Sequence, residues 1–471
     1  MATVRSINLP NAGPPTPSPP EKEGVGLTIH DSPAISVIGE KGHLGLKRHL
    51  HKQLLSSIPA DRVERLSEPE LRHELGRLAE ELFRHNSDLL GFSGKQLLVE
   101  QVVDEVLGYG PLGGLMRDNE ISEILINGPR QVFIEKHGQL RTTDVCFHDE
   151  EHLVQVVRRM IVSTGRRIDK KSPMVDARLP DGSRLNAVLN PPALNGPLVS
   201  IRRFGVRPLT VEDLVANDSL TSAMLDFLSA CVKSRISMII SGGTGSGKTT
   251  LLNALSRYIP SSERLVTVED TAELELQQPH VAKMESQPAD LKGEGEVSMR
   301  DLVRNALRMR PDRIIVGECR GAEALDMLQA MNTGHEGSMT TVHANSTREA
   351  LARVELMVNL AGIDIPPAAI RKLTASSINV VVQLSRTPGG KRKIVAISEV
   401  TGMEGDVISM QDLFEFVQTG VHAERGVEGH FRATGIRPHF LRKLNVRGAS
   451  LTSDLFMERS LQPLRNREIG R

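Results

Sequence analysis

Between residues 219 and 420, short apolar runs alternate with stretches of helical periodicity. We predict strands at Ile236–Ile240, Leu265–Val268, Ile314–Val316, Met339–Val342 and Val380–Leu384. Strands that alternate with helices indicate an α/β domain with a parallel-rich sheet.

Residues 96–205 show a different pattern, in which short β-rich runs surround one helical stretch. The run at Glu151–Ile161 has helical periodicity, and strands are predicted at Glu123–Ile126, Val132–Glu135, Arg184–Val188 and Leu198–Phe204. This mixture predicts a smaller α+β domain. Residues 206–218, which include Pro208, then form a hinge linker between the two domains.

The ends of the chain carry weaker signals. Six prolines lie between Pro10 and Pro20, and a segment so poor in large apolar groups cannot offset its ordering entropy, so residues 1–40 are predicted to be a disordered tail. Leucines at three- and four-residue spacing predict a helical bundle element at residues 42–95. Beyond residue 420 we expect a C-terminal extension, 421–471, that begins with a loop at Gly420–Arg432.

Composition narrows the classes of function. Lys and Arg number 58, as do Asp and Glu, and the chain has no Trp and two Tyr. Zero net charge and few aromatic rings argue against nucleic acid as the partner. The three cysteines are far apart and form no CxxC pair, which favours a reducing compartment over a disulfide framework. We find no signal peptide and no membrane-spanning run, so a cytoplasmic chain without a direct membrane span is expected.

The segment from Gly242 to Thr249 reads Gly-Gly-Thr-Gly-Ser-Gly-Lys-Thr and fits the P-loop pattern. A predicted strand precedes it and a helix follows, so backbone N–H groups and a helix N-terminus would converge on phosphates. Lys248 would reach the β- and γ-phosphates of ATP, and the Thr249 hydroxyl would bind Mg²⁺. The nucleotide-binding residues predicted are Gly242, Gly243, Thr244, Gly245, Ser246, Gly247, Lys248, Thr249 and Thr250.

Acidic residues follow two of the predicted strands. Glu318 ends an apolar strand, and Gly317 stands where an ordinary Walker B strand carries an aspartate. The second acidic group, Glu269, Asp270 and Glu273, comes directly after another strand. Carboxylates at strand ends next to a P-loop can hold Mg²⁺ and polarise a water molecule. We therefore predict metal ligands at Thr249, Glu318, Glu269 and Asp270.

His335 and His343 flank the predicted strand Met339–Val342. Their spacing is not that of a zinc site. From the residues alone, two interpretations stay open: both histidines are structural, or they sense the γ-phosphate and pass its presence to a neighbour.

Taken together, these motifs resemble the Walker A motif, Asp box, atypical Walker B motif and His box of the type II and type IV secretion ATPases. Within that superfamily the chain looks most like the tight-adherence (Flp) pilus assembly ATPases, the CpaF/TadA branch. That likeness is carried by Gly108-Tyr-Gly-Pro-Leu, Glu123-Ile-Leu-Ile-Asn-Gly and Ser172-Pro-Met-Val-Asp-Ala-Arg. The missing CxxC zinc module also favours this branch over the type II export ATPases.

The resemblance implies a RecA-like ATPase domain preceded by a smaller, PAS-like α+β domain, in a homohexamer that binds ATP and Mg²⁺. It gives Glu273 the task of polarising the attacking water, places Glu318 near Mg²⁺, and makes His335 and His343 the His-box pair. It also implies that arginines of the first domain act in trans on a neighbouring subunit's nucleotide. The matching candidates are Arg178, Arg184, Arg202 and Arg203.

The function implied is a cytoplasmic hexameric motor that powers assembly of a type IV tight-adherence pilus. It would act through inner-membrane platform proteins and only indirectly on pilin, and some relatives also drive retraction. The alternative is a type IV secretion traffic ATPase that exports DNA or effector proteins. A DNA motor and a nucleotide-binding scaffold are further rivals, against which zero net charge and the retained acids at Glu273 and Glu318 argue.

Overall fold

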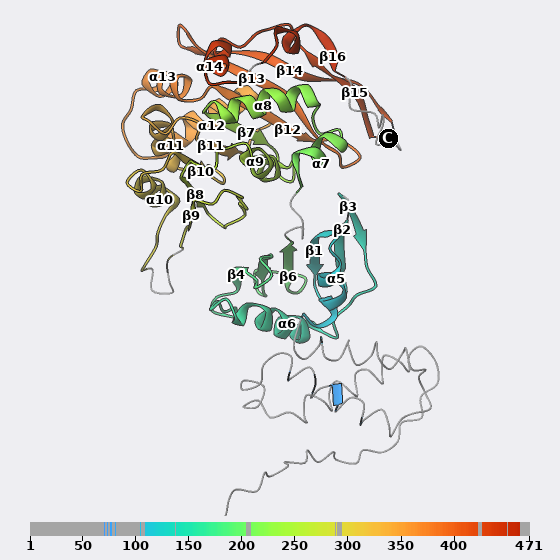
Figure 1. Cartoon of the computed structure of the whole chain (residues 1–471). Helices are drawn as coiled ribbons and strands as arrows, with labels where there is room; N and C mark the ends of the chain where they lie inside the picture. The colour runs from blue at the N-terminus through green and yellow to red at the C-terminus, as the bar shows by residue number, and fades with distance from the viewer. Residues whose placement is uncertain are drawn as a thin grey trace, which may run out of the picture.

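The structure is a computed structural model that describes residues 109–136, 138–203, 209–287, 289, 294–422, 426–449 and 451–461. It also describes isolated positions at residues 70, 73, 76, 77, 81 and 104. The predicted tail at residues 1–40 and nearly all of the predicted helical element at 42–95 lie outside the described residues. Two domains follow one another along the described chain, the first below the second in Figure 1.

An antiparallel sheet of six strands, in the order β3-β2-β1-β6-β5-β4, forms the first domain. Its helix α6 covers one face, because Leu153, Val156 and Ile161 pack against apolar side chains of the strands. The elements are η2 (Gly110–Leu112), α5 (Gly113–Arg117), β1 (Ile121–Asn127), β2 (Val132–Lys136), β3 (Gln139–Thr142), α6 (Glu150–Val162), β4 (Met174–Arg178), β5 (Arg184–Val188) and β6 (Leu198–Arg202). The predicted helix and four predicted strands are confirmed, and β3 and β4 are additional.

Ten strands form the sheet of the second domain, in the order β16-β15-β14-β13-β12-β7-β11-β10-β8-β9. The six strands from β12 to β9 run parallel to their neighbours, and the four others are antiparallel. The strands are β7 (Met238–Gly242), β8 (Leu265–Glu269), β9 (Val281–Glu285), β10 (Arg313–Val316), β11 (Met339–Val342), β12 (Val380–Arg386), β13 (Arg392–Glu404), β14 (Val407–His422), β15 (Gly426–Ala433) and β16 (Arg459–Leu461). All five predicted strands are present, and the domain is a RecA-like α/β fold.

Helices cover both faces of this sheet (Figure 1). One apolar core joins the strands to α7, α8, α9 and α14, and a second joins them to α10 through α13. The helices are α7 (Val211–Ala216), α8 (Ser222–Lys233), α9 (Lys248–Ser256), α10 (Met299–Ala306), α11 (Glu323–Asn332), α12 (Thr347–Asn359), α13 (Pro367–Ser377), α14 (Leu441–Val446) and η3 (Ser453–Phe456). Within the described ranges, no helix combines the length and apolarity that crossing a bilayer requires.

The chain after residue 420 differs from the sequence prediction. The predicted loop at Gly420–Arg432 is wrong, because β14 continues to His422 and β15 begins at Gly426. Phe431 and Phe456 from this region are buried in the same core as the central strands of the second domain. Much of β14 is only partly buried, so its hydrophobic alternation is too weak to indicate a strand from sequence.

Part of the predicted linker 206–218 is also folded. Helix α7 starts at Val211 behind a capping box, in which Thr210 and Asp213 satisfy each other's backbone N–H groups. Val211 and Leu214 are buried in the core of the second domain, while residues 204–208 lie outside the described part. The domain boundaries as a whole stay predictions.

The two domains contact each other through a pair of turns. Arg386, at the end of β12, donates from Nη2 to the carbonyl oxygen of Gly138 at 2.7 Å and lies 3.1 Å from Oε2 of Glu135. Gly390, in the turn after β12, faces Gly138 so closely that a Cβ at position 390 would lie 3.2 Å from the Gly138 oxygen.

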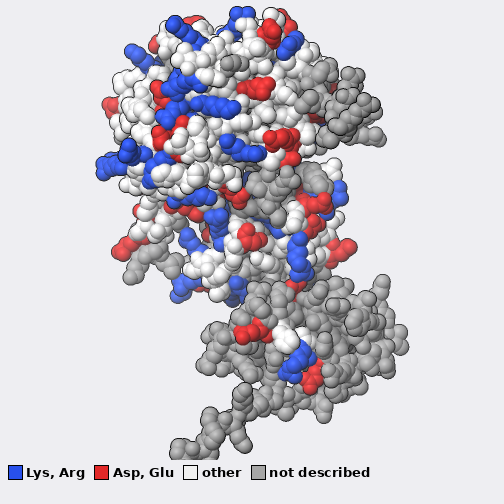
Figure 2. Space-filling model, in the orientation of Figure 1, with Lys and Arg blue, Asp and Glu red and all other residues white. Residues whose placement is uncertain are grey.

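On the face seen in Figure 2, basic and acidic side chains are intermixed over both domains.

Candidate nucleotide site

The P-loop connects β7, a strand buried along its whole length, to the start of α9. Gly245 and Gly247 have positive φ angles of 67° and 95°, which L side chains rarely adopt. A Cβ at Gly242 would lie 2.7 Å from the carbonyl oxygen of Leu384 on β12. The glycines therefore let the loop turn tightly and lie against the neighbouring strand.

Lys248 begins α9 and curls back over the loop. Its Nζ donates to the carbonyl oxygens of Gly242 at 3.0 Å and Gly243 at 3.1 Å. Burial lowers the pKa of Lys248, an effect that the nearby Glu318 carboxylate opposes. The ammonium group thus lies at the loop, and its hydrogen-bond partners in the described part of the chain are backbone oxygens, which phosphate oxygens could replace.

A cleft surrounds the P-loop, and both domains line it. The first domain contributes two arginines, and the second contributes the loop, the ends of its parallel strands and a histidine. The lining residues are Arg184, Arg202, Thr244, Gly245, Ser246, Gly247, Lys248, Thr249, Thr250, Glu269, Asp270, Thr271, Glu273, Gly317, Glu318, Arg320 and His343. The structure thus brings together most of the residues that the sequence predicted.

Glu269 ends β8 and is only 2% exposed. Its Oε1 accepts hydrogen bonds from the backbone N–H groups of Glu273 (2.7 Å) and Leu274 (2.8 Å). Its Oε2 is buried and has no hydrogen-bond partner among the described residues. Burial raises the pKa of Glu269 to about 7, although the two N–H donors oppose that rise.

Glu318 follows β10 and is paired with a residue that the sequence analysis missed. Arg320 donates from Nη2 to Oε2 of Glu318 at 2.6 Å, and its Nη1 lies 3.9 Å from Asp270. Burial pushes the pKa of Glu318 upward, but the hydrogen bond and charge of Arg320 outweigh it, so the pKa falls below its ordinary value. The one signal for Arg320 in the sequence is its place two residues after Glu318, on a strand-end loop.

The four candidate arginines occupy different places. Arg184 and Arg202 are paired in register on β5 and β6, on the sheet face opposite α6. Arg202 Nη1 lies 3.6 Å from Oε1 of Glu273, and Arg184 holds Asp176 through two hydrogen bonds of 3.1 and 2.6 Å. Both line the cleft of their own chain.

Arg178 and Arg203 are not brought to the P-loop. Arg178 lies 3.6 Å from Glu285 on β9, outside the residues that line the nucleotide cleft. Arg203 donates from Nη1 to backbone oxygens of Leu115 and Asp118, within its own domain. Arg184 on β5 and Arg202 on β6 face the cleft instead. The spacing of the four arginines in the sequence does not reveal which of them reach the cleft.

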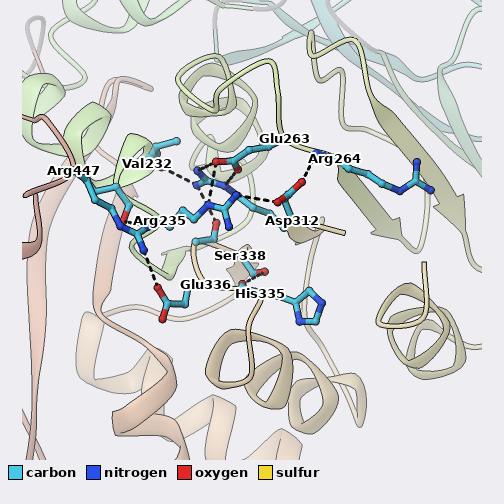
Figure 3. A network of polar contacts seen from close by, with 12 residues as sticks. Val232, Arg235, Glu263, Arg264, Asp312, His335, Glu336, Ser338 and Arg447 are labelled. Carbon is cyan, nitrogen blue, oxygen red and sulfur yellow. Dashed lines mark hydrogen bonds and ion pairs between the residues drawn. The ribbon is translucent and has the colours of Figure 1, made fainter. Parts of the chain in front are cut away.

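The two histidines lie at opposite ends of β11. His343 follows the strand and lines the cleft, whereas His335 precedes it, beside the buried network of Figure 3. Four strand residues at about 3.3 Å each separate the two ends by roughly 13 Å. The structure therefore brings His343 to the cleft and leaves His335 at the far end of the strand. That the pair senses the γ-phosphate and passes its presence to a neighbour stays a prediction.

The donor set fits a divalent cation that is shared with phosphate. Thr249, Asp270 and Glu318 line the cleft together with Glu269, and all offer the oxygen ligands that Mg²⁺ prefers. Among the described residues, no group of three or more His, Cys, Asp or Glu side chains is arranged to hold a metal ion by itself. This agrees with Mg²⁺ sites that use one or two protein oxygens plus phosphates and water.

Comparison with known proteins identifies the family. The profile of a family described as "Type II/IV secretion system protein" matches residues 105–422. The chain belongs to this family. Its match covers the first domain, the P-loop, both acidic strand ends and the His335–His343 segment, so the superfamily resemblance of the four motifs is confirmed.

Individual members of the family carry more specific names. A Mycobacterium tuberculosis (strain H37Rv) protein whose name refers to conjugal transfer is 38% identical over 329 residues, covering 69% of this chain and 91% of that protein. The type IV secretion system protein VirB11 of Bartonella quintana is 33% identical over 324 residues, covering 61% and 90%. These names agree better with the type IV secretion alternative than with the pilus interpretation.

The chain also matches solved structures. The VirB11 ATPase of the Brucella suis type IV secretion system has 31% identity, covers 61% of this chain and 94% of its own, and gives a TM-score of 0.34. The pilus retraction motor PilT with bound ADP has 20% identity, covers 59% and 78%, and gives a TM-score of 0.43.

Proposed function

We propose that this chain is an Mg²⁺-dependent ATP hydrolase that drives a type IV secretion machine. The observation that carries the proposal is the cleft itself, where Arg202 of the first domain meets Glu273 beside a complete P-loop. Membership of the type II/IV secretion family supports a role in secretion or pilus assembly. The names of the relatives favour type IV secretion between these two.

The residues of the cleft divide the chemistry among them. Backbone N–H groups of the P-loop and Lys248 bind the phosphates and orient the nucleotide. Thr249 and Glu318 would hold Mg²⁺, which would neutralise negative charge on the phosphates. Glu273 accepts a proton from, or orients, the attacking water, and Arg202 balances charge on the transferring group. His343, which lines the cleft, contacts the γ-phosphate.

Coupling to movement follows from the shared cleft. Because Arg184 and Arg202 belong to one domain and Lys248 to the other, the nucleotide joins the two domains, and hydrolysis weakens that connection. The predicted linker then allows the first domain to rotate. In a homohexamer at the inner face of the membrane, this rotation would act on inner-membrane platform proteins of the machine.

Tight-adherence pilus assembly is the second candidate. It is supported by the sequence stretches from Glu123 and from Ser172 and by the lack of a zinc module. The chemistry would be the same, and only the partner and cargo would differ.

A Glu273→Gln variant tests the chemistry and the partner. Its ATP turnover should fall by at least 100-fold while ATP binding stays within about threefold, because the amide keeps the shape but loses the base. Glu404→Gln, which is exposed at the end of β13, is the matched control. Unchanged turnover in Glu273→Gln would contradict the assignment and favour a scaffold.

The same variant, crosslinked in its native cells in the presence of ATP and purified, reports the partner by mass spectrometry. Effector-coupling or DNA-processing proteins would support type IV secretion. A polytopic membrane protein encoded beside pilin genes would transfer the assignment to pilus assembly.

A further inference from the structure

Gly317 leaves a gap in the acidic motif, since an aspartate ordinarily precedes the glutamate of a Walker B strand. In this structure the space above Gly317 is filled from the neighbouring strand. A Cβ at position 317 would lie 2.9 Å from Cγ and 3.2 Å from Oε1 of Glu269. A side chain at 317 and the Glu269 side chain therefore compete for one volume.

The sheet register explains this proximity. β8 and β10 are parallel neighbours, and Val268 is opposite Val316, so the next residue on each strand, Glu269 and Gly317, lie side by side. Adjacent strands are about 4.8 Å apart. A carboxylate that starts from the neighbouring strand must cross this distance, and glutamate provides one more methylene than aspartate for doing so.

The two oxygens of Glu269 have separate environments. Oε1 is held by the N–H groups of Glu273 and Leu274, which fixes the backbone of the residue proposed to act on water. Oε2 is buried without a partner among the described residues, and Glu269 lines the cleft with Thr249 and Glu318. A buried carboxylate oxygen without a donor is costly unless a cation or water meets it.

We propose that Glu269 replaces the missing Walker B aspartate. From the neighbouring strand it supplies the carboxylate oxygen that faces the metal side of the nucleotide, and through its other oxygen it positions Glu273. Glu269 thus meets the metal side of the site with one oxygen and orients Glu273 with the other, and this inference rests on the proposed binding of Mg²⁺ and nucleotide.

A reciprocal exchange tests the proposal. The variants are Glu269→Ala, Gly317→Asp and the double variant Glu269→Ala/Gly317→Asp, with Glu269→Gln as a nearly isosteric form that keeps an acceptor for both N–H groups. The first readout is the affinity for fluorescent ADP with and without Mg²⁺, which does not depend on hydrolysis. The second is the melting temperature in EDTA. The third is the separate measurement of kcat and KM for ATP hydrolysis.

Glu269→Ala and Glu269→Gln should each lose about tenfold or more of the Mg²⁺-dependent gain in ADP affinity. Glu269→Gln should keep a melting temperature close to that of the unmodified chain or above it, which excludes misfolding as the cause. Gly317→Asp alone should lower the melting temperature because its side chain collides with Glu269. The double variant should regain both stability and Mg²⁺ dependence relative to the two single variants.

Two outcomes would overturn the inference. One is Mg²⁺-dependent ADP affinity that is unchanged in both Glu269 variants. The other is additive loss in the double variant, because independent sites add whereas residues that compete for one volume do not. If the unmodified chain itself shows no ATP turnover but Glu269→Gln still loses Mg²⁺ dependence, the proposed function fails while the inference stands.

Discussion

Glu263→Gln is expected to destabilise the ATPase domain strongly, because Glu263 neutralises a fully buried arginine. Arg313 begins β10 with 0% exposure, and its Nε and Nη2 donate to the two carboxylate oxygens of Glu263 at 2.5 and 3.2 Å. Its Nη1 donates to the carbonyl oxygen of Val232 at 2.7 Å. Figure 3 shows Arg235 reaching the same Glu263.

The magnitude follows from burial. Removing one charge of a buried pair leaves the other uncompensated and costs about 3–5 kcal/mol. For a domain of this size, each kcal/mol shifts the melting temperature by roughly 2–4 °C. Glu263→Gln should therefore lower the melting temperature by roughly 6–20 °C, even though the amide has nearly the same shape as the carboxylate.

Thermal unfolding followed by circular dichroism, without nucleotide and near neutral pH, measures this shift. Glu212→Gln is the matched control, because Glu212 pairs with Arg257 at 3.4 Å but both side chains are largely exposed, and exposed pairs contribute at most about 1 kcal/mol. Equal shifts for Glu263→Gln and Glu212→Gln would refute the reasoning. A double variant, Arg313→Met/Glu263→Leu, should be more stable than Glu263→Gln, since it leaves no buried charge.

Three further predictions concern the cleft and the core. Arg202→Ala should reduce kcat for ATP by about 100-fold or more. The control is Arg141→Ala, exposed on β3, whose kcat should stay within about threefold of that of the unmodified chain. Equal steady-state rates for the two variants would remove Arg202 from the site. Phe456→Ala should lower the free energy of unfolding in urea by about 3–5 kcal/mol, because Phe456 is 1% exposed in the ATPase core. A decrease below about 1 kcal/mol would show that the C-terminal strands fold separately. Burial raises the pKa of Glu269 to about 7 from an ordinary 4.5. Between these two pH values the folded chain keeps a proton that the unfolded chain releases. The free energy of unfolding therefore falls as pH rises from 4.5 to 7. Glu269→Gln should remove that part of the slope in melting experiments in EDTA, and parallel slopes would contradict it.

The sequence predicts the parallel centre of the fold well, because strands buried on both faces are continuous apolar runs. Ile314–Val316 is of this kind, and it lies in β10 of the structure. The antiparallel half of the sheet escapes prediction, since β14 has one face only partly covered and carries charged residues among apolar ones. Its place in the sheet is decided by pairing with β13 and β15, which is tertiary information.

The candidate site shows the same contrast between residues that local motifs reveal and residues that only the tertiary structure reveals. Residues that follow one strand or one loop, such as Lys248 and Glu318, are visible as local motifs. Which arginines face the cleft depends on the face of β5 and β6 that they occupy, and the alternation there selects Arg184 and Arg202 over Arg203. His335 lies away from the cleft although it is near His343 in the sequence, because β11 separates the two histidines.

The contact between Gly138 and Gly390 has a consequence for how this protein can diverge. Both residues have positive φ, 76° and 82°, so an L-residue at either position meets a backbone penalty. A Cβ at position 390 would also lie 3.2 Å from the Gly138 oxygen of the other domain, whereas a Cβ at position 138 would make ordinary contacts of 3.4 Å or more. We expect homologues that keep this contact to keep glycine in both turns, and those that lose one glycine to lose the other and to hold their two domains together elsewhere.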